Sequence, residues 1–361
     1  MKKTPIRAAV SCMFLVLMMG LSACCGNGRQ APSTSLRYHF ASQEEGQQLR
    51  LSGTEYFDVL TQNDIDWKLQ TVGKSLDEFK AIAAGEILDF TDDEKKAISK
   101  VMDFIEARTT ELGFRLPADD EIIFIKTNMG DEGHMGGYTL KNEIYLNTYE
   151  VEGLSRAFLA DPMYDADYLE YIMHFDRALI AHEIFHCLTR NNAEFRKEMY
   201  SLIGFTVMDH EMEFGPTVSE LLVHNPDVEH YDSWAEFTID GQKRRCALLC
   251  VYPGTFADAV AVNPKAHFFD DMRIVLVPLD EPDTMIPIEE ASDFYDVIGR
   301  NTDYICFAEE TLADNFMNLI AFGFFGRYDH GIVSRKIEFI PYGTPQLIRE
   351  MHRTLLEHFP R

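Results

Sequence analysis

The chain reads HEIFH from His182 to His186, inside a segment, residues 168–190, whose apolar residues recur at helical spacing. Residues four positions apart on a helix lie on the same side, about 6 Å apart along the axis, so both imidazoles can reach one metal ion. Glu183 follows the first histidine, where its carboxylate can take a proton from a water activated by that metal. The pattern therefore predicts two metal ligands, His182 and His186, and a general base, Glu183.

A zinc site with two histidines needs a third protein ligand and an open position for water. The residues directly after His186 include no glycine or histidine, which argues against a metzincin-type third ligand. Acidic residues occur instead at Glu309, Glu310 and Asp314, at the start of a predicted helix, residues 309–325. Glu310 and Asp314 are one helical turn apart, so one carboxylate can bind the metal while the other orients a ligand histidine. Glu309 is a competing ligand, but only Glu310 has an acid four residues later.

The two motifs together, H-E-x-x-H and E-x-x-A-D-N, resemble those of the gluzincin (thermolysin/neprilysin-like) zinc metallopeptidases. The resemblance implies an α+β, zincin-like fold with an active-site helix and an edge-strand sheet. It also implies one Zn²⁺ per chain, held by His182, His186 and Glu310, with Glu183 as general base and Asp314 as the acid that orients a histidine.

The chain between His186 and Glu310 is longer than in thermolysin-like enzymes, so we expect a β-hairpin-rich insertion at about residues 210–300. Within it, β-prone runs flank the turn Asp240-Gly241, which is typical of a hairpin. Residues 138–147 alternate as one strand, placed like the edge strand that lines the peptide-binding cleft of zincins.

Capping boxes indicate where two further helices begin. They pair Ser75 with Glu78 and Thr91 with Glu94, and the second helix is predicted to end at Gly113. Outside the motif segments, helices are also predicted over residues 194–205 and 346–359.

The first 23 residues are typical of a bacterial lipoprotein signal peptide. A basic start precedes an apolar run, residues 8–21, that is too short for a comfortable membrane span and ends in L-S-A-C at Cys24. We therefore expect Cys24 to be lipidated and the protein to be exported and anchored in the cell envelope. An ordinary signal peptide or an uncleaved anchor is the alternative.

After Cys24, glycine, glutamine, serine and proline without apolar periodicity predict a flexible tether over residues 24–50. Residues 51–361 are then the catalytic domain. An exported location permits disulfides, and Cys187 with Cys306 is the candidate pair because each lies near a proposed ligand. Isolated buried thiols are the alternative.

The composition excludes some functions. Hydrophobic residues make up 46% of the chain, which is typical of a globular protein, and 59 acidic against 33 basic residues give a formal charge of −26. This charge argues against nucleic acid as a partner and weakly favours basic peptides.

The sequence thus predicts a membrane-tethered zinc metallopeptidase, whose partners are a peptide or protein substrate and, through its lipid, a membrane. Two alternatives stay open: a non-catalytic zincin-like lipoprotein that binds a peptide or protein partner, and zinc-dependent hydrolysis of a non-peptide bond. In gluzincins a tyrosine or histidine stabilises the oxyanion, and the candidates here are Tyr328, His330 and Tyr342.

Overall fold

The computed structural model describes residues 36–117, 121–161, 163, 166–330 and 337–361, with only the backbone at some positions. Helices make up 48% and strands 19%, so the predicted α+β class is confirmed. The predicted signal peptide and the predicted lipidation site, Cys24, lie outside the described residues. No helix in the described ranges is both long and apolar enough to cross a membrane.

The first sheet has five strands, in the order β1-β3-β5-β4, with β2 beside β3. Its members are β1 (Tyr38–Phe40), β2 (Ile87–Leu88), β3 (Ile122–Thr127), β4 (Gly137–Leu140) and β5 (Glu143–Asn147). β1, β3 and β5 are parallel, whereas β4 pairs antiparallel with β5. β4 therefore lies at the end of the sheet path.

The prediction of one strand over residues 138–147 is wrong, because a two-residue turn after Leu140 divides it into β4 and β5. Lys141 adopts a positive φ of 54° at this turn. A two-residue turn does not interrupt the alternation of apolar and polar residues, so the two strands resemble one strand in the sequence. The turn also lacks the Asn-Gly or Asp-Gly pair that is typical of a two-residue hairpin.

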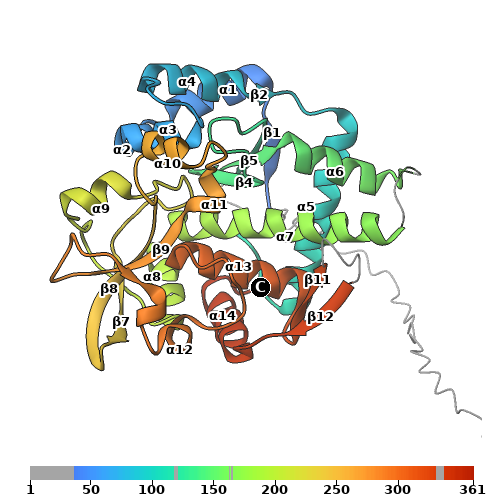
Figure 1. Ribbon diagram of the computed structural model, residues 1–361. Coiled ribbons are helices and arrows are strands. Elements are labelled where there is room, and N and C mark those ends of the chain that lie inside the picture. Colours follow the sequence, from blue (N-terminus) through green and yellow to red (C-terminus); the bar gives the residue numbers. More distant parts are fainter. Residues whose placement is uncertain (1–35, 118–120, 162, 164–165, 331–336) are drawn as a thin grey trace, which may run out of the picture. The chain divides into compact units, whose positions relative to one another are not determined.

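Helix α7 (Ala166–Asn191) contacts β4 and β5 of this sheet and also α13 (Ala308–Phe322), as Figure 1 shows. Helices α5 (Asp92–Leu112) and α6 (Thr148–Phe158) pack against α7 as well. One hydrophobic core joins these elements and includes Ile98, Val101, Ile184, Phe185, Leu312 and Phe316. The two predicted motif helices are therefore confirmed as neighbouring core helices.

Both capping boxes are confirmed. Ser75 and Glu78 cap α4 (Leu76–Gly85), and Thr91 and Glu94 cap α5. The α5 helix ends at Gly113, whose φ of 91° is a left-handed conformation that glycine adopts without strain.

The predicted tether is too long, because part of residues 24–50 is folded. β1 and helix α1 (Gln43–Ser52) begin before residue 51, and helices α2 (Thr54–Val59) and α3 (Gln62–Lys68) follow. Arg50 of α1 is fully buried and forms an ion pair with Asp131 at 2.7 Å. The buried residues of α1 are Gly46 and Arg50, so the helix has no buried apolar stripe that hydrophobic periodicity could have revealed.

The segment between α7 and α13 contains a second, fully antiparallel sheet of order β10-β9-β8-β7-β6. Its strands are β6 (Thr206–Val207), β7 (Ser233–Ile239), β8 (Gln242–Val251), β9 (Arg273–Pro278) and β10 (Ile286–Pro287). The predicted hairpin is confirmed, and both turn residues, Asp240 and Gly241, have positive φ. That this section is an insertion stays a prediction.

The remaining elements are short helices, one further hairpin and the C-terminal helix. They are α8 (Ala193–Leu202), α9 (Pro216–Leu221), α10 (Phe256–Val262), α11 (Phe268–Asp271), η1 (Ile288–Glu290), α12 (Phe294–Ile298), β11 (Gly326–His330), β12 (Ile337–Pro341) and α14 (Pro345–His358). The predicted helices at 194–205 and 346–359 correspond to α8 and α14.

Candidate metal centre

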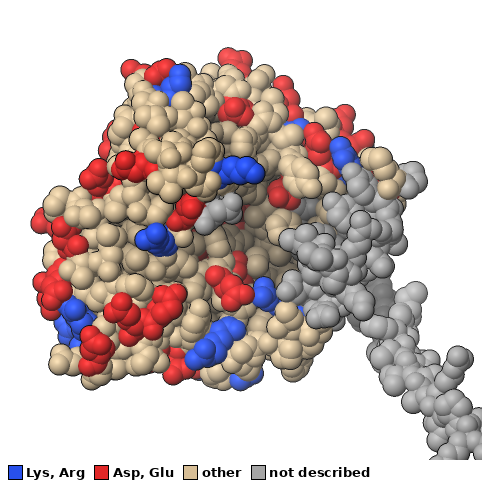
Figure 2. All heavy atoms as spheres, viewed as in Figure 1, with Lys and Arg blue, Asp and Glu red and all other residues tan. Residues whose placement is uncertain are grey.

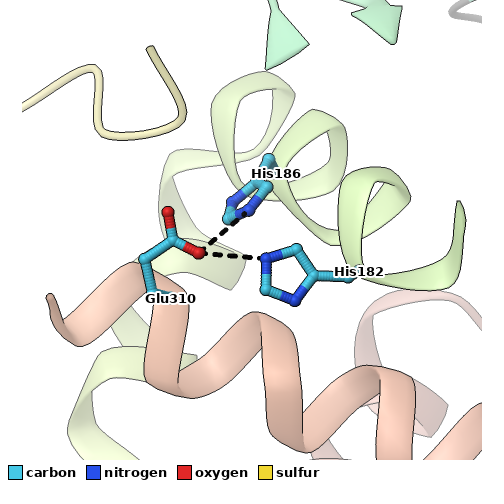
Figure 3. Close-up of side chains that lie close together, drawn as sticks. All are labelled: His182, His186 and Glu310. Carbon is cyan, nitrogen blue, oxygen red and sulfur yellow. Dashed lines mark hydrogen bonds and ion pairs between the residues drawn. The ribbon is translucent and has the colours of Figure 1, made fainter. Parts of the chain in front are cut away.

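The two motif helices bring three metal-binding side chains together. Figure 3 shows His182 and His186 on α7 pointing towards Glu310 on α13. Glu310 Oε2 lies 3.0 Å from His182 Nε2 and 3.7 Å from His186 Nε2. A tetrahedral zinc ion with bonds of 2.0–2.1 Å separates its ligands by about 3.3 Å, so these distances suit one ion.

Carboxylates hold the other nitrogen of each histidine. His182 Nδ1 lies 3.1 Å from Asp314 Oδ1, and His186 Nδ1 lies 3.1 Å from Glu309 Oε1. Each ring is therefore oriented with its Nε2 towards the common point, as in metal sites where an outer carboxylate fixes a ligand histidine. Asp314 thus lies beside a histidine of the site, as the sequence motif predicted. Glu309 contacts His186 Nδ1, so it is placed to orient this ring and not to bind the ion.

Glu309 has both of its oxygens occupied by hydrogen bonds. Thr189 Oγ1 donates to Oε1 at 2.5 Å, and the Tyr200 hydroxyl donates to Oε2 at 2.8 Å. Burial alone would raise the pKa of Glu309, but the hydrogen bond and charge of His186 outweigh it and lower that pKa. Sequence reasoning missed Thr189 and Tyr200. Only Thr189 carried a signal, since it lies one helical turn after His186.

Glu183 is buried beside the ligands, and its Oε2 has no hydrogen-bond partner among the described residues. Burial, and next the charge of Asp227, raise the pKa of Glu183 well above its usual value. Its other oxygen packs against Gly137, the first residue of β4, where an added Cβ would lie only 2.8 Å from Glu183 Oε1. A glycine is therefore needed there to admit the carboxylate.

The donor set fits a divalent cation. Like Glu183 Oε2, His186 Nε2 is one of the buried polar atoms of the described residues that have no hydrogen-bond partner, and such an atom costs about 1–3 kcal/mol. An ion between His182, His186 and Glu310 would satisfy it. Two imidazoles and a carboxylate are a ligand set that suits zinc and similar transition metals.

His182 and Glu310 shift each other's pKa in opposite directions when no metal is bound. Burial alone would lower the pKa of His182, but the hydrogen bonds to Asp314 and Glu310 outweigh it and raise that pKa well above its usual value. Burial would raise the pKa of Glu310, yet the hydrogen bond from His182 and the charges of both histidines lower it. The raised pKa of His182 favours a proton on this imidazole in the metal-free protein.

The structure adds two residues that no sequence motif indicated, Asn225 and Asp227, from the irregular stretch between α9 and β7. Asn225 donates a hydrogen bond to Glu310 Oε1. The carboxylate of Asp227 groups with Glu183 and His186 in a second buried set of possible ligand atoms, all within 4.8 Å of one another. An asparagine and an aspartate in a loop have no spacing that would have revealed them.

A tyrosine that the sequence did not indicate, Tyr304, also lies near the site. The ring centroid of Tyr304 lies 6.0 Å from that of His182. Tyr342, proposed from the sequence, is buried and donates its hydroxyl to the Asn318 carbonyl at 3.0 Å, so it is committed elsewhere. The side chains of Tyr328 and His330 lie outside the described residues.

The candidate disulfide does not form, because Cys187 and Cys306 are both free, buried thiols. Burial raises the pKa of Cys187 to about 12, so it is an unreactive thiol. The alternative expectation of isolated buried thiols is confirmed for this pair.

The function of the chain has to be argued from this site, because a fold by itself does not define an activity. The site supplies three converging side chains that could bind a metal, an adjacent carboxylate with one oxygen lacking a hydrogen-bond partner among the described residues, and an acid beside Nδ1 of each histidine. Comparisons with protein-family models, with curated proteins and with solved structures gave no match.

Proposed function

We propose that the chain is a zinc-dependent metallopeptidase of the gluzincin type with a zincin-like fold. One observation carries the proposal: His182, His186 and Glu310 converge from α7 and α13 beside Glu183, whose Oε2 has no hydrogen-bond partner among the described residues. Zinc is the proposed ion because two histidines and a glutamate are the ligand set of zinc peptidases. Lipidation of Cys24 would anchor the protein in the cell envelope.

Each side chain then has a defined task. His182, His186 and Glu310 would bind the ion, while Asp314 and Glu309 keep the imidazoles in position. Zinc, when bound, would supply Lewis-acid activation of a water and of the scissile carbonyl. Glu183 would accept the proton of the attacking water and pass it to the leaving amine.

The sheet and the surface charge suggest the substrate class. An extended peptide can add to the outer edge of β4, because backbone hydrogen bonds at a sheet edge recognise extended chains. Figure 2 shows acidic side chains spread over the face in view, with fewer basic ones, and the formal charge is −26. The long-range field therefore favours basic peptides.

Metal analysis of the purified, folded protein tests the proposal first. We expect about one zinc per chain, removed by a strong chelator and regained on dialysis against zinc. The loaded protein should then hydrolyse members of a peptide library, and the metal-free protein should not. A folded protein that takes up no zinc would contradict the proposal.

One observation favours the second candidate, a non-catalytic lipoprotein that binds a peptide or protein partner. His182, Glu183, His186 and Glu310 are all buried, so a substrate does not reach them in this conformation. A protein that retains zinc and binds peptides, yet leaves every member of the library intact, would establish this alternative.

A further inference from the structure

The irregular stretch Leu222–Glu229, here called the covering segment, lies against the candidate metal centre. Asn225 within it donates a hydrogen bond to Glu310 Oε1, and the Asp227 carboxylate groups with Glu183 and His186. Both residues are themselves buried. The chain therefore closes its own site with a short loop.

The covering segment also occupies the outer edge of β4. The Thr139 N–H donates to Asp227 Oδ1 at 2.7 Å, and the Thr139 hydroxyl donates to the same oxygen at 2.8 Å. This N–H points away from β5 and is a group that a bound peptide would use. Asp227 thus takes the place that the backbone of a substrate would fill.

Arg190, near the end of α7, fastens the covering segment to β4. Its Nη2 donates to the carbonyls of Pro226 at 2.9 Å and Asp227 at 3.1 Å, and also to the Thr139 carbonyl at 3.3 Å. Its Nη1 donates to the Lys141 carbonyl at 3.2 Å. One guanidinium therefore holds both sides of the groove together.

The position of Asp227 has a consequence for the metal. His186 Nδ1 is engaged by Glu309, so Nε2 is the nitrogen that remains for an ion. The Asp227 carboxylate belongs to a second group of possible ligand atoms, which shares His186 with the first group but contains neither His182 nor Glu310. A catalytic zinc site has three protein ligands and an open position, whereas a fourth protein ligand closes it. An ion bound by His182, His186, Glu310 and Asp227 would have no position for a substrate.

We propose that Asp227 is a displaceable fourth ligand of the metal and that the covering segment is a built-in inhibitor of the substrate groove. The enzyme is then latent until this segment moves away from β4. This inference rests on the proposed zinc site, and it adds a regulation to that same site.

A cavity of about 1070 Å³ adjoins the covering segment. A ligand bound in this cavity could displace the segment from β4. Leu140 and Lys141 at the end of β4 line it, together with residues of the segment itself. The acids Glu211, Glu213 and Glu229 also line it. A basic peptide bound there would contact the covering segment directly. The binding of substrate and the displacement of the covering segment would therefore take place in the same groove.

The replacement Asp227→Asn, studied with cobalt in place of zinc, tests the ligand assignment. We expect the visible absorption of the cobalt protein to change, zinc affinity to fall at least about tenfold and peptide hydrolysis to rise. The matched control is Asp232→Asn, because Asp232 pairs with Arg196 at 2.6 Å and belongs to neither group of possible ligands. Its cobalt spectrum should equal that of the wild type.

The replacement Arg190→Gln tests the inhibitor without altering any of the four ligands. We expect zinc content to be kept, the Thr139 amide to exchange its hydrogen faster, limited proteolysis to occur within residues 222–229 and hydrolysis to rise. Faster exchange is expected because the covering segment no longer shields that amide.

The outcomes separate this inference from the proposed function. An unchanged cobalt spectrum and zinc affinity in Asp227→Asn would overturn the ligand assignment, and Asp227 would then be only a neighbour of Glu183. Wild-type hydrolysis as fast as that of both variants would overturn the inhibitor but leave the peptidase standing. A changed cobalt spectrum with no hydrolysis by any variant would support the fourth ligand and refute the peptidase.

Discussion

The ligand-bearing helices and the covering segment meet at one point but are held there by different means. On α7 and α13, the helix spacing sets the side chains, and each histidine is fixed by a carboxylate from the opposite helix. The covering segment has no regular structure and depends on Arg190 and the Thr139 amide. The side chains of the candidate metal centre are thus held by two packed core helices, whereas the covering segment is held by a few polar contacts, and this difference is what the proposed regulation requires.

The largest effect should come from removing the base while the frame stays intact. Glu183→Gln should lower the rate of peptide hydrolysis by about 10²–10⁴-fold, because it removes proton transfer but no proposed ligand. Zinc content, measured by elemental analysis, should be unchanged. Retained hydrolysis in this variant would show that Glu183 is not the base.

The neighbouring acids on α13 give a sharper test of the frame. Glu310→Gln should abolish tight zinc binding, whereas Glu309→Gln should weaken it only about 10–100-fold, because Glu309 acts through His186. The two variants have the same chemistry at adjacent positions, so each is the control for the other. Equal losses, or a greater loss for Glu309→Gln, would reassign the ligand.

The contact between β4 and α7 predicts an intermediate effect. Gly137→Ala should lower kcat by about 10–100-fold with zinc retained, since its Cβ would press on Glu183 Oε1 and misplace the base. Gly136→Ala is the matched control, because its Cβ would meet its nearest atom at an ordinary 3.6 Å. Equal kinetics of both variants would show that Gly137 has no role in placing Glu183.

The smallest signal is the release of a proton on metal binding. The raised pKa of His182 means that the metal-free fold binds this proton more tightly than the unfolded chain does. This contribution to stability is therefore full below the unfolded pKa and is lost as the pH rises through the raised value. Zinc must displace the proton, so its affinity should fall as the pH falls.

Calorimetric titration of zinc at pH 7 in two buffers of different ionisation enthalpy measures that release. We expect a net release of protons by the wild type and a smaller release by Asp314→Asn, which keeps the three proposed ligands but removes a hydrogen bond that raises the pKa of His182. The same heat in both buffers would show that His182 is already neutral in the metal-free protein.

The helical part of the fold was predictable because its signals are local. The capping box at Thr91 and the stop at Gly113 each depend on residues within a few turns of one another. The Asp240-Gly241 turn is local in the same sense. Such patterns indicate an element before its neighbours are known.

Other parts could not be predicted because their stabilising contacts are distant in sequence. Arg50 fixes α1 through Asp131, and the turn at Lys141 follows no recognised turn pair. The sequence raised Glu309 and Glu310 as rivals, and only the packing of α13 on α7 shows that they face different atoms of the histidines.

The sequence alone therefore determined that two histidines, a glutamate and a pair of acids lie on helical faces suited to a metal, because helix periodicity sets those relations locally. The tertiary structure decided which glutamate faces both Nε2 atoms, what holds each imidazole, and that Asp227 reaches the site from a loop. These relations arise from packing between segments that are far apart in the chain, so no local sequence pattern can predict them.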